Sequence, residues 1–215
     1  MTDQHEVEAK FEADPDSLAT LLDLQEVDGL TVAHNPAIDQ DDLYFDTEAG
    51  HLKAAGASLR VRRKDDLALM TFKGERMASE HEPHIVTRLE DEVELPGFDV
   101  GTLTWERPLW VEPEPSPLSR GRRLTAGADL LPVARLQTNR TVLMVMDDVG
   151  QSVELAVDLC VATRVADRRI VDFVEVEAEL KAGDAEFLTR VLQGLQAAVP
   201  GLQPSTRTKL ERALA

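Results

Sequence analysis

Charged and apolar residues alternate along several segments of this chain, and this alternation limits the folds it can adopt. Residues 4 to 12 place Glu6, Glu8 and Lys10 on one side and Val7, Ala9 and Phe11 on the other. Successive side chains of a β-strand point to opposite faces, so a period of two predicts strands. A sheet of such strands has one apolar face and one charged face.

The same pattern, interrupted by turn residues, divides most of the chain into strands. The stretch 96–132 differs, because its prolines favour an exposed excursion with one or two short helices. We therefore expect one α+β domain over residues 1–215, mainly antiparallel β and closed like a barrel. Further strands are expected at residues 31–34, 43–46, 58–63, 68–73, 85–95, 135–147, 152–164 and 170–181, and helices after residue 16 and at 183–199 and 205–214.

The charge balance limits the partners. The chain carries 23 Lys and Arg against 40 Asp and Glu, a formal net charge of −17. This charge repels phosphate backbones and anionic lipid, so we expect neither nucleic acid nor a membrane as partner. The chain has no apolar run of about 18 residues and no signal-peptide pattern, and the lone Cys160 fits a reducing compartment. We expect a cytoplasmic protein with a buried Cys160, and leave open whether it forms a homodimer.

The charged strand faces contain two complementary sets of side chains. Each stripe alone is more often a solvated face, but a carboxylate such as Asp158 inside an apolar run needs a partner. Strand carboxylates can hold a hard divalent cation, and Arg and Lys on neighbouring strands can cradle phosphates. Together they predict a metal-bound polyphosphate in the barrel lumen. The stripes are Glu6, Glu8 and Lys10; Arg60 and Arg62; Lys73; Arg140; Asp158; and Glu175, Glu177 and Glu179.

The segment Glu6-Val-Glu8-Ala-Lys10 resembles the ExExK strand of the CYTH, or triphosphate tunnel metalloenzyme, superfamily. The resemblance implies an eight-stranded closed β tunnel with helices packed outside. It also implies hydrolysis of a triphosphate that depends on Mg²⁺ or Mn²⁺. Further matches follow in the family's order at residues 43–47, 59–62, 71–74, 140, 158, 174–181 and 205–214.

The resemblance also assigns roles by position. Glu179 is either a further metal ligand or part of the tunnel lining, and Arg88, Glu90 and Glu92 resemble tunnel-wall residues. The catalytic candidates are Lys10, Asp158 and Glu177, and either carboxylate could take the proton of the attacking water. The implied phosphate binders are Lys10, Arg60, Arg62, Lys73, Arg140 and Lys209, and the implied metal ligands are Glu6, Glu8, Glu175 and Glu177, with Asp158 beside them.

Inorganic triphosphate is the expected substrate, because thiamine triphosphate would need an aromatic platform for its rings and only 4% of residues are aromatic. Two alternatives stay open. A class IV-like adenylyl cyclase would act on ATP in the same tunnel. A non-catalytic module would bind polyphosphate or nucleotide without turnover.

Overall fold

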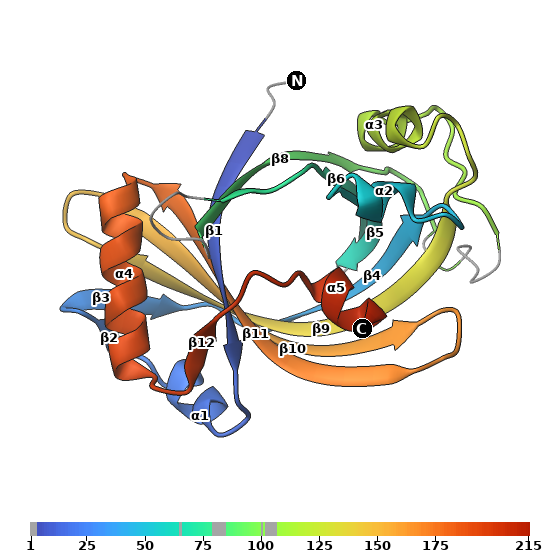
Figure 1. The fold of residues 1–215 in the computed structure, drawn as a ribbon. Helices are drawn as coiled ribbons and strands as arrows, with labels where there is room; N and C mark the ends of the chain where they lie inside the picture. Colours follow the sequence, from blue (N-terminus) through green and yellow to red (C-terminus); the bar gives the residue numbers. More distant parts are fainter. Residues whose placement is uncertain (1–3, 65, 79–84, 100, 102–106) are drawn as a thin grey trace.

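The computed structural model (Figure 1) describes residues 4–64, 66–78, 85–99, 101 and 107–215. The strands are β1 (Gln4–Ala13), β2 (Glu26–Val27), β3 (Leu30–His34), β4 (Ile38–Asp46), β5 (Ser58–Lys64), β6 (Leu67–Lys73), β7 (Met77–Ala78), β8 (Ile85–Glu94), β9 (Leu131–Met146), β10 (Ser152–Arg164), β11 (Ile170–Ala182) and β12 (Leu202–Pro204). The helices are α1 (Ser17–Leu22), α2 (His51–Ala54), α3 (Ser116–Leu124), α4 (Ala185–Ala198) and α5 (Lys209–Leu214).

Eight of these strands form a closed antiparallel barrel, which confirms the predicted fold. They follow the order β10-β11-β1-β8-β6-β5-β4-β9, and pairing of β9 with β10 closes the ring. Figure 1 looks into this ring. Closure leaves no unpaired edge in the barrel wall. The short strands β3, β7 and β12, which pair with β9, β8 and β1, extend the wall locally.

The apolar faces of the strands point outward, under the helices. On one side Phe11 of β1 and Leu155 of β10 share a buried cluster with Leu188 of α4. On the other side Leu59 of β5 shares a cluster with Leu118 of α3. Because helices bury the outer face, strand alternation turns the charged face into the lumen.

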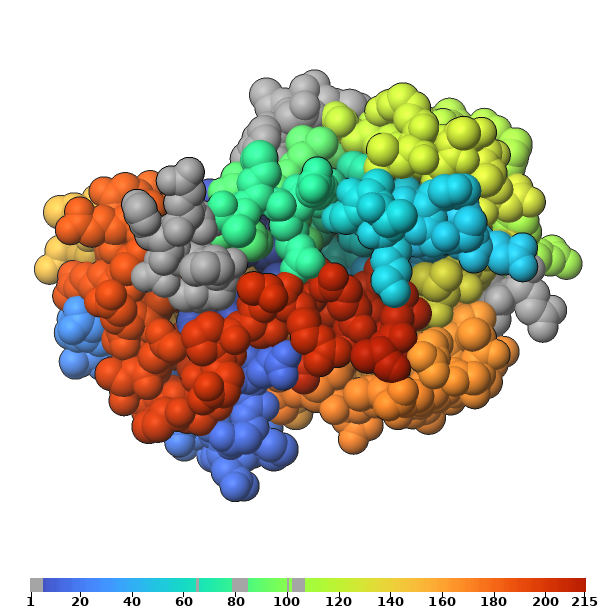
Figure 2. Space-filling model, viewed as in Figure 1, coloured from blue at the N-terminus to red at the C-terminus, as the bar shows by residue number. Residues whose placement is uncertain are grey.

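The last helix departs from the expectation that helices pack outside. Ala213 of α5 shares a buried cluster with Tyr44 and Leu136, which alternate with the outward-facing residues of their strands. The helix therefore packs on the inner face of the wall. Figure 2, from the same side as Figure 1, shows the C-terminal segment (red) lying across the ring. We call this the closed end of the barrel.

This helix also begins later than the sequence predicts, at Lys209 instead of residue 205. Residues 205–208 are instead an extended strap that carries the chain from β12 to α5. The backbone N–H of Ser205 donates to Lys10 O at 2.8 Å. Thr208 and Glu211 then form a capping box, which fixes the helix start. Among the described helices, none has the length and hydropathy needed to cross a bilayer.

Candidate functional site

A cavity of about 380 Å³ occupies the barrel lumen. We call it the lumen cavity. Its described lining has more bases than acids, whereas the whole chain has more acids than bases. The fold therefore gathers positive charge where a polyanion could enter. The lining includes Lys10, Arg60, Arg62, Lys64, Lys73, Arg88, Arg140, Lys181 and Lys209, with Glu6, Glu8, Glu90, Glu92, Glu154, Glu177 and Glu179.

A second, larger cavity of about 1090 Å³ lies along β4, β9, β10 and β11. Of the predicted site residues, none lines its described part. Its walls mix apolar and polar residues, such as Val161 and Asn139. We place the functional site in the lumen cavity because the complementary charges meet there.

Lys10 lies among three carboxylates. The pairing of β1 with β11 sets Lys10 opposite Glu177 and Glu8 opposite Glu179. The Lys10 ammonium donates to Glu177 and lies 3.4 Å from Glu8 Oε2 and 3.7 Å from Glu175 Oε1. Burial would lower the pKa of Lys10, but these carboxylates outweigh it and raise the pKa. Lys10 therefore keeps its positive charge at neutral pH.

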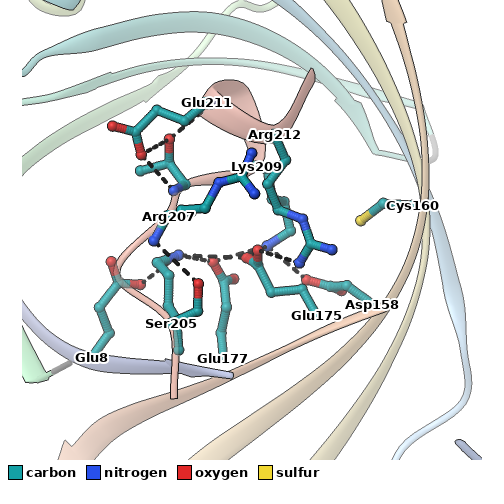
Figure 3. Close-up of polar contacts among 12 residues, drawn as sticks. Glu8, Asp158, Cys160, Glu175, Glu177, Ser205, Arg207, Lys209, Glu211 and Arg212 are labelled. Carbon is teal, nitrogen blue, oxygen red and sulfur yellow. Dashed lines mark hydrogen bonds and ion pairs between the residues drawn. The ribbon is translucent and has the colours of Figure 1, made fainter. Parts of the chain in front are cut away.

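Asp158, a buried carboxylate in an apolar strand, is paired with Arg140. Arg140 Nε and Nη2 donate to its two oxygens at 2.8 and 2.7 Å. Lys209 Nζ, delivered by α5, lies 2.9 Å from Asp158 Oδ2 and 2.8 Å from Glu177 Oε1 (Figure 3). Burial would raise the pKa of both carboxyls, but the surrounding bases outweigh burial and lower them. Both acids are therefore ionised at neutral pH.

Glu175, like Asp158, is fully buried, with 0% of its side chain exposed. Its Oε1 lies 2.9 Å from Lys209 Nζ, and Arg212 Nη1 of the same helix lies 3.9 Å from Oε2. Burial raises the pKa of Glu175 despite the charges of Lys209 and Lys10. Strand register places it opposite Glu12, one step further than Glu177 toward the closed end.

The arginines of β5 meet a carboxylate that the sequence did not single out. Arg62 Nε and Nη2 donate to Asp42 Oδ1 and Oδ2 at 2.6 and 2.8 Å. Arg60 Nη1 lies 3.8 Å from Asp42 Oδ2. Asp42 belongs to the acidic run 39–42, where composition alone does not separate inner from outer residues. Strand alternation is the sequence signal that could have identified it: Asp42 is next to the outward-facing Leu43 and therefore faces the lumen.

The predicted wall residues of β8 meet the acids of β1. Arg88 Nη2 lies 2.7 Å from Glu8 Oε1. Lys73 Nζ donates to Glu6 Oε2 at 2.8 Å and lies 3.2 Å from Glu90 Oε2. The structure thus places Lys73, Glu6 and Glu8 together, as predicted for a charged lumen.

The acids of this region are the candidate ligands of a divalent cation. In the part of the chain that the structure describes, no group of three or more His, Cys, Asp or Glu side chains is gathered closely enough to hold a metal ion. The donor chemistry nevertheless fits. Glu6 and Glu8 share one strand face, Glu179 lies opposite Glu8, and carboxylate oxygens are the ligands that Mg²⁺ and Mn²⁺ prefer. To hold a cation, Glu6 and Glu8 would have to release Lys73 and Arg88. Glu179 would have to release Lys181, whose Nζ lies 2.7 Å from its Oε2.

Cys160 is a buried residue whose thiol is held in its neutral form. Burial raises the pKa of its thiol to about 12, and it contacts Thr138 Oγ1 at 3.7 Å. A thiol with this pKa is a poor nucleophile at neutral pH. The predicted small buried side chain is confirmed.

Comparison with known proteins gives a consistent family and fold. A model of the CYTH domain matches residues 4–214. A candidate adenylate cyclase from Bacillus halodurans has a similar structure, with TM-score 0.67 at 19% identity over 100% of both chains. A candidate adenylyl cyclase from Hippeastrum, described as having dominant triphosphatase activity, gives 0.60 at 18% over 97% of this chain and 95% of that one.

A more distant structure extends the same fold. The mimivirus capping enzyme triphosphatase gives a TM-score of 0.52 at 10% identity over 93% of this chain and 91% of that one. No curated protein matched the chain. At these identities the solved structures show a shared fold and leave the chemistry to the site itself.

Proposed function

The chain belongs to the CYTH domain family, and on that premise we propose that it hydrolyses inorganic triphosphate in the lumen cavity with the help of Mg²⁺ or Mn²⁺. The observation that carries this proposal is the convergence of Lys10, Arg140 and Lys209 on one enclosed cavity in a protein of net charge −17. Phosphoryl transfer asks a protein mainly for positioning and charge neutralisation. The lumen cavity offers both.

The size and lining of the lumen cavity support a small polyphosphate. Its volume of about 380 Å³ lies at the lower end of the usual range for small-molecule sites. Tyr44 is the one aromatic residue in its described lining, so the lining holds no pair of rings to enclose a base. This lack favours inorganic triphosphate over ATP or thiamine triphosphate.

A bound Mg²⁺ or Mn²⁺ would polarise phosphoryl oxygens and offset their charge. Strand register supports Glu6 and Glu8 as its ligands, with Glu177 or Glu179 completing the set from the neighbouring strand β11. Glu175, which the family resemblance also implies, is 0% exposed and is not part of the described lining of the lumen cavity, so we do not assign it to the metal.

The two carboxylates proposed for catalysis differ in what they can reach. Asp158 is 0% exposed and its oxygens are taken by Arg140 and Lys209, so it fixes these two bases. Glu177 also contacts Lys209 and Arg140, but unlike Asp158 it is 17% exposed and lines the lumen cavity. We therefore assign to Glu177 the contact with the attacking water. Its lowered pKa makes it an ionised acceptor that orients the water.

The test is phosphate release from inorganic triphosphate, thiamine triphosphate, ATP and long polyphosphate, each with Mg²⁺ or Mn²⁺. We expect inorganic triphosphate to be the preferred substrate. Lys10→Ala should lower its turnover about 10²-fold or more, because it removes a fixed cation from the site. Lys53→Ala, an exposed lysine outside the lumen cavity, is the matched control and should retain activity.

Three results would contradict the proposal. An unchanged rate in Lys10→Ala would place the chemistry elsewhere. Formation of cyclic AMP from ATP would favour the cyclase. Tight polyphosphate binding without turnover would favour a binding module.

A further inference from the structure

We propose that Asp42 is a positioning residue that gives the two β5 arginines different roles. It holds Arg62 in a fixed orientation and leaves Arg60 to contact the phosphate. The inference rests on the proposed function, because it names how that site presents its bases. In the sequence Arg60 and Arg62 are equivalent, since they share one strand face. Their contacts in the structure are not equivalent.

Arg62 is fully engaged. Its Nε and Nη2 form two parallel bonds, at 2.6 and 2.8 Å, with the two oxygens of Asp42. Both side chains are buried, with Arg62 9% and Asp42 0% exposed. A bidentate pair of this kind fixes the plane and orientation of the guanidinium. An arriving phosphate would have to compete with both bonds to recruit Arg62.

Arg60 is held by a hydrogen bond at Nε, and its terminal nitrogens lie near the limit of ion-pair distance. Its Nε donates to Thr71 Oγ1 at 3.3 Å, and Thr71 in turn donates to Glu92 Oε2 at 2.7 Å. Its terminal nitrogens make only long ion-pair contacts, with Nη1 3.8 Å from Asp42 Oδ2 and Nη2 4.0 Å from Glu92 Oε2. These nitrogens can therefore turn to a phosphate without breaking a short bond.

Asp42 connects the two arginines. Burial would raise its pKa, but the charges of Arg62 and Arg60 outweigh burial and lower it, so Asp42 stays ionised. Its charge allows two guanidinium groups to lie side by side on one strand face without mutual repulsion. Removing the charge should release Arg62 toward the lumen cavity and disturb Arg60.

The test compares neighbouring aspartates of β4 that face opposite ways. In Asp42→Asn we expect kcat for inorganic triphosphate to fall by up to about 10²-fold, because Arg62 and Arg60 lose the carboxylate that orients them. We expect KM to fall or stay equal, because the lumen cavity gains an uncompensated cation. Asp41→Asn is the matched control, since Asp41 pairs with Arg135 outside the lumen cavity. It should change neither constant by more than about twofold.

Arginine variants separate anchoring from phosphate binding. Arg60→Gln should raise KM most. Arg62→Gln should lower kcat as Asp42→Asn does, with a smaller rise in KM because Asp42 is left without its partner, and the double variant of Asp42 and Arg62 should be no worse than either single variant. A rise in KM for Arg62→Gln equal to that for Arg60→Gln would overturn the inference. If Asp42→Asn fails to fold, as judged by circular dichroism, the contrast between the two arginine variants decides.

Failure of the inference is distinguishable from failure of the proposed function. A wild-type protein that hydrolyses inorganic triphosphate, with Asp42→Asn behaving like Asp41→Asn, overturns the inference alone. A wild-type protein that neither hydrolyses triphosphate nor binds it in calorimetry overturns both.

Discussion

The two ends of the lumen use the same residue types for different purposes. Along β11 the inward side chains Glu175, Glu177, Glu179 and Lys181 are 0, 17, 27 and 37% exposed. Exposure thus rises from the closed end, where α5 packs, toward what we call the open end. At the closed end carboxylates hold a helix, and at the open end they remain accessible to solutes. Position along the lumen, more than residue type, separates a structural acid from a candidate ligand.

The largest expected effect comes from breaking the closed end. Lys209→Ala removes the base that contacts Asp158, Glu175 and Glu177, at 2.9, 2.9 and 2.8 Å. Removing one partner of a buried ion pair costs about 3–5 kcal/mol. We expect a loss of this size in the free energy of unfolding, measured in urea, together with loss of triphosphate turnover.

Arg207→Ala is the control for this variant, because Arg207 is an exposed base of the strap that precedes α5. It should change the free energy of unfolding by no more than about 0.5 kcal/mol. Equal losses in the two variants would mean that the ion pairs of Lys209 do not hold the closed end.

Acid should weaken the closed end next. The lowered pKa of Asp158 means that the folded protein binds its proton less readily than the unfolded chain. Its contribution to stability is therefore present above the unfolded pKa of about 4 and disappears as the pH falls through the lower, folded pKa. In Asp158→Asn we expect the free energy of unfolding to fall less steeply below about pH 4.

The matched control is Asp172→Asn, at an exposed position near the turn between β10 and β11. It should keep the acid sensitivity of the wild type. If Asp158→Asn keeps it as well, the pairing of Asp158 with Arg140 and Lys209 does not control stability in acid.

The smallest effects should come from single glutamates of β11, and they sharpen the comparison between the ends. Glu179→Gln should raise the Mg²⁺ concentration needed for half-maximal turnover by about tenfold and leave the urea midpoint unchanged. For Glu175→Gln we expect the reverse, a shifted urea midpoint with an unchanged Mg²⁺ titration, because its contacts are to α5. A raised Mg²⁺ requirement in Glu175→Gln would support the ligand role that the family resemblance implies.

Much of the barrel could be predicted from local patterns. The alternation around Glu6 to Lys10 and along residues 170–181 fixed strand type and the side on which each charge lies. The short strands β2, β7 and β12 and the four-residue helix α2 were not predicted, because pieces of this length have no periodicity to detect. The single-domain expectation for residues 1–215 remains a prediction, as do the cytoplasmic location and the homodimer.

By itself, the sequence determined that this chain forms β-strands with one charged face, and that its bases and acids are of the kinds that bind phosphate and a hard cation. The alternation of side chains along a strand determines the charged face, because this alternation depends only on neighbouring residues in the chain. The tertiary structure alone decided that Lys209 reaches Asp158 and Glu175, and that Asp42 holds Arg62. Those contacts depend on which strands pair and in what register, and such pairings join residues that are distant in the sequence.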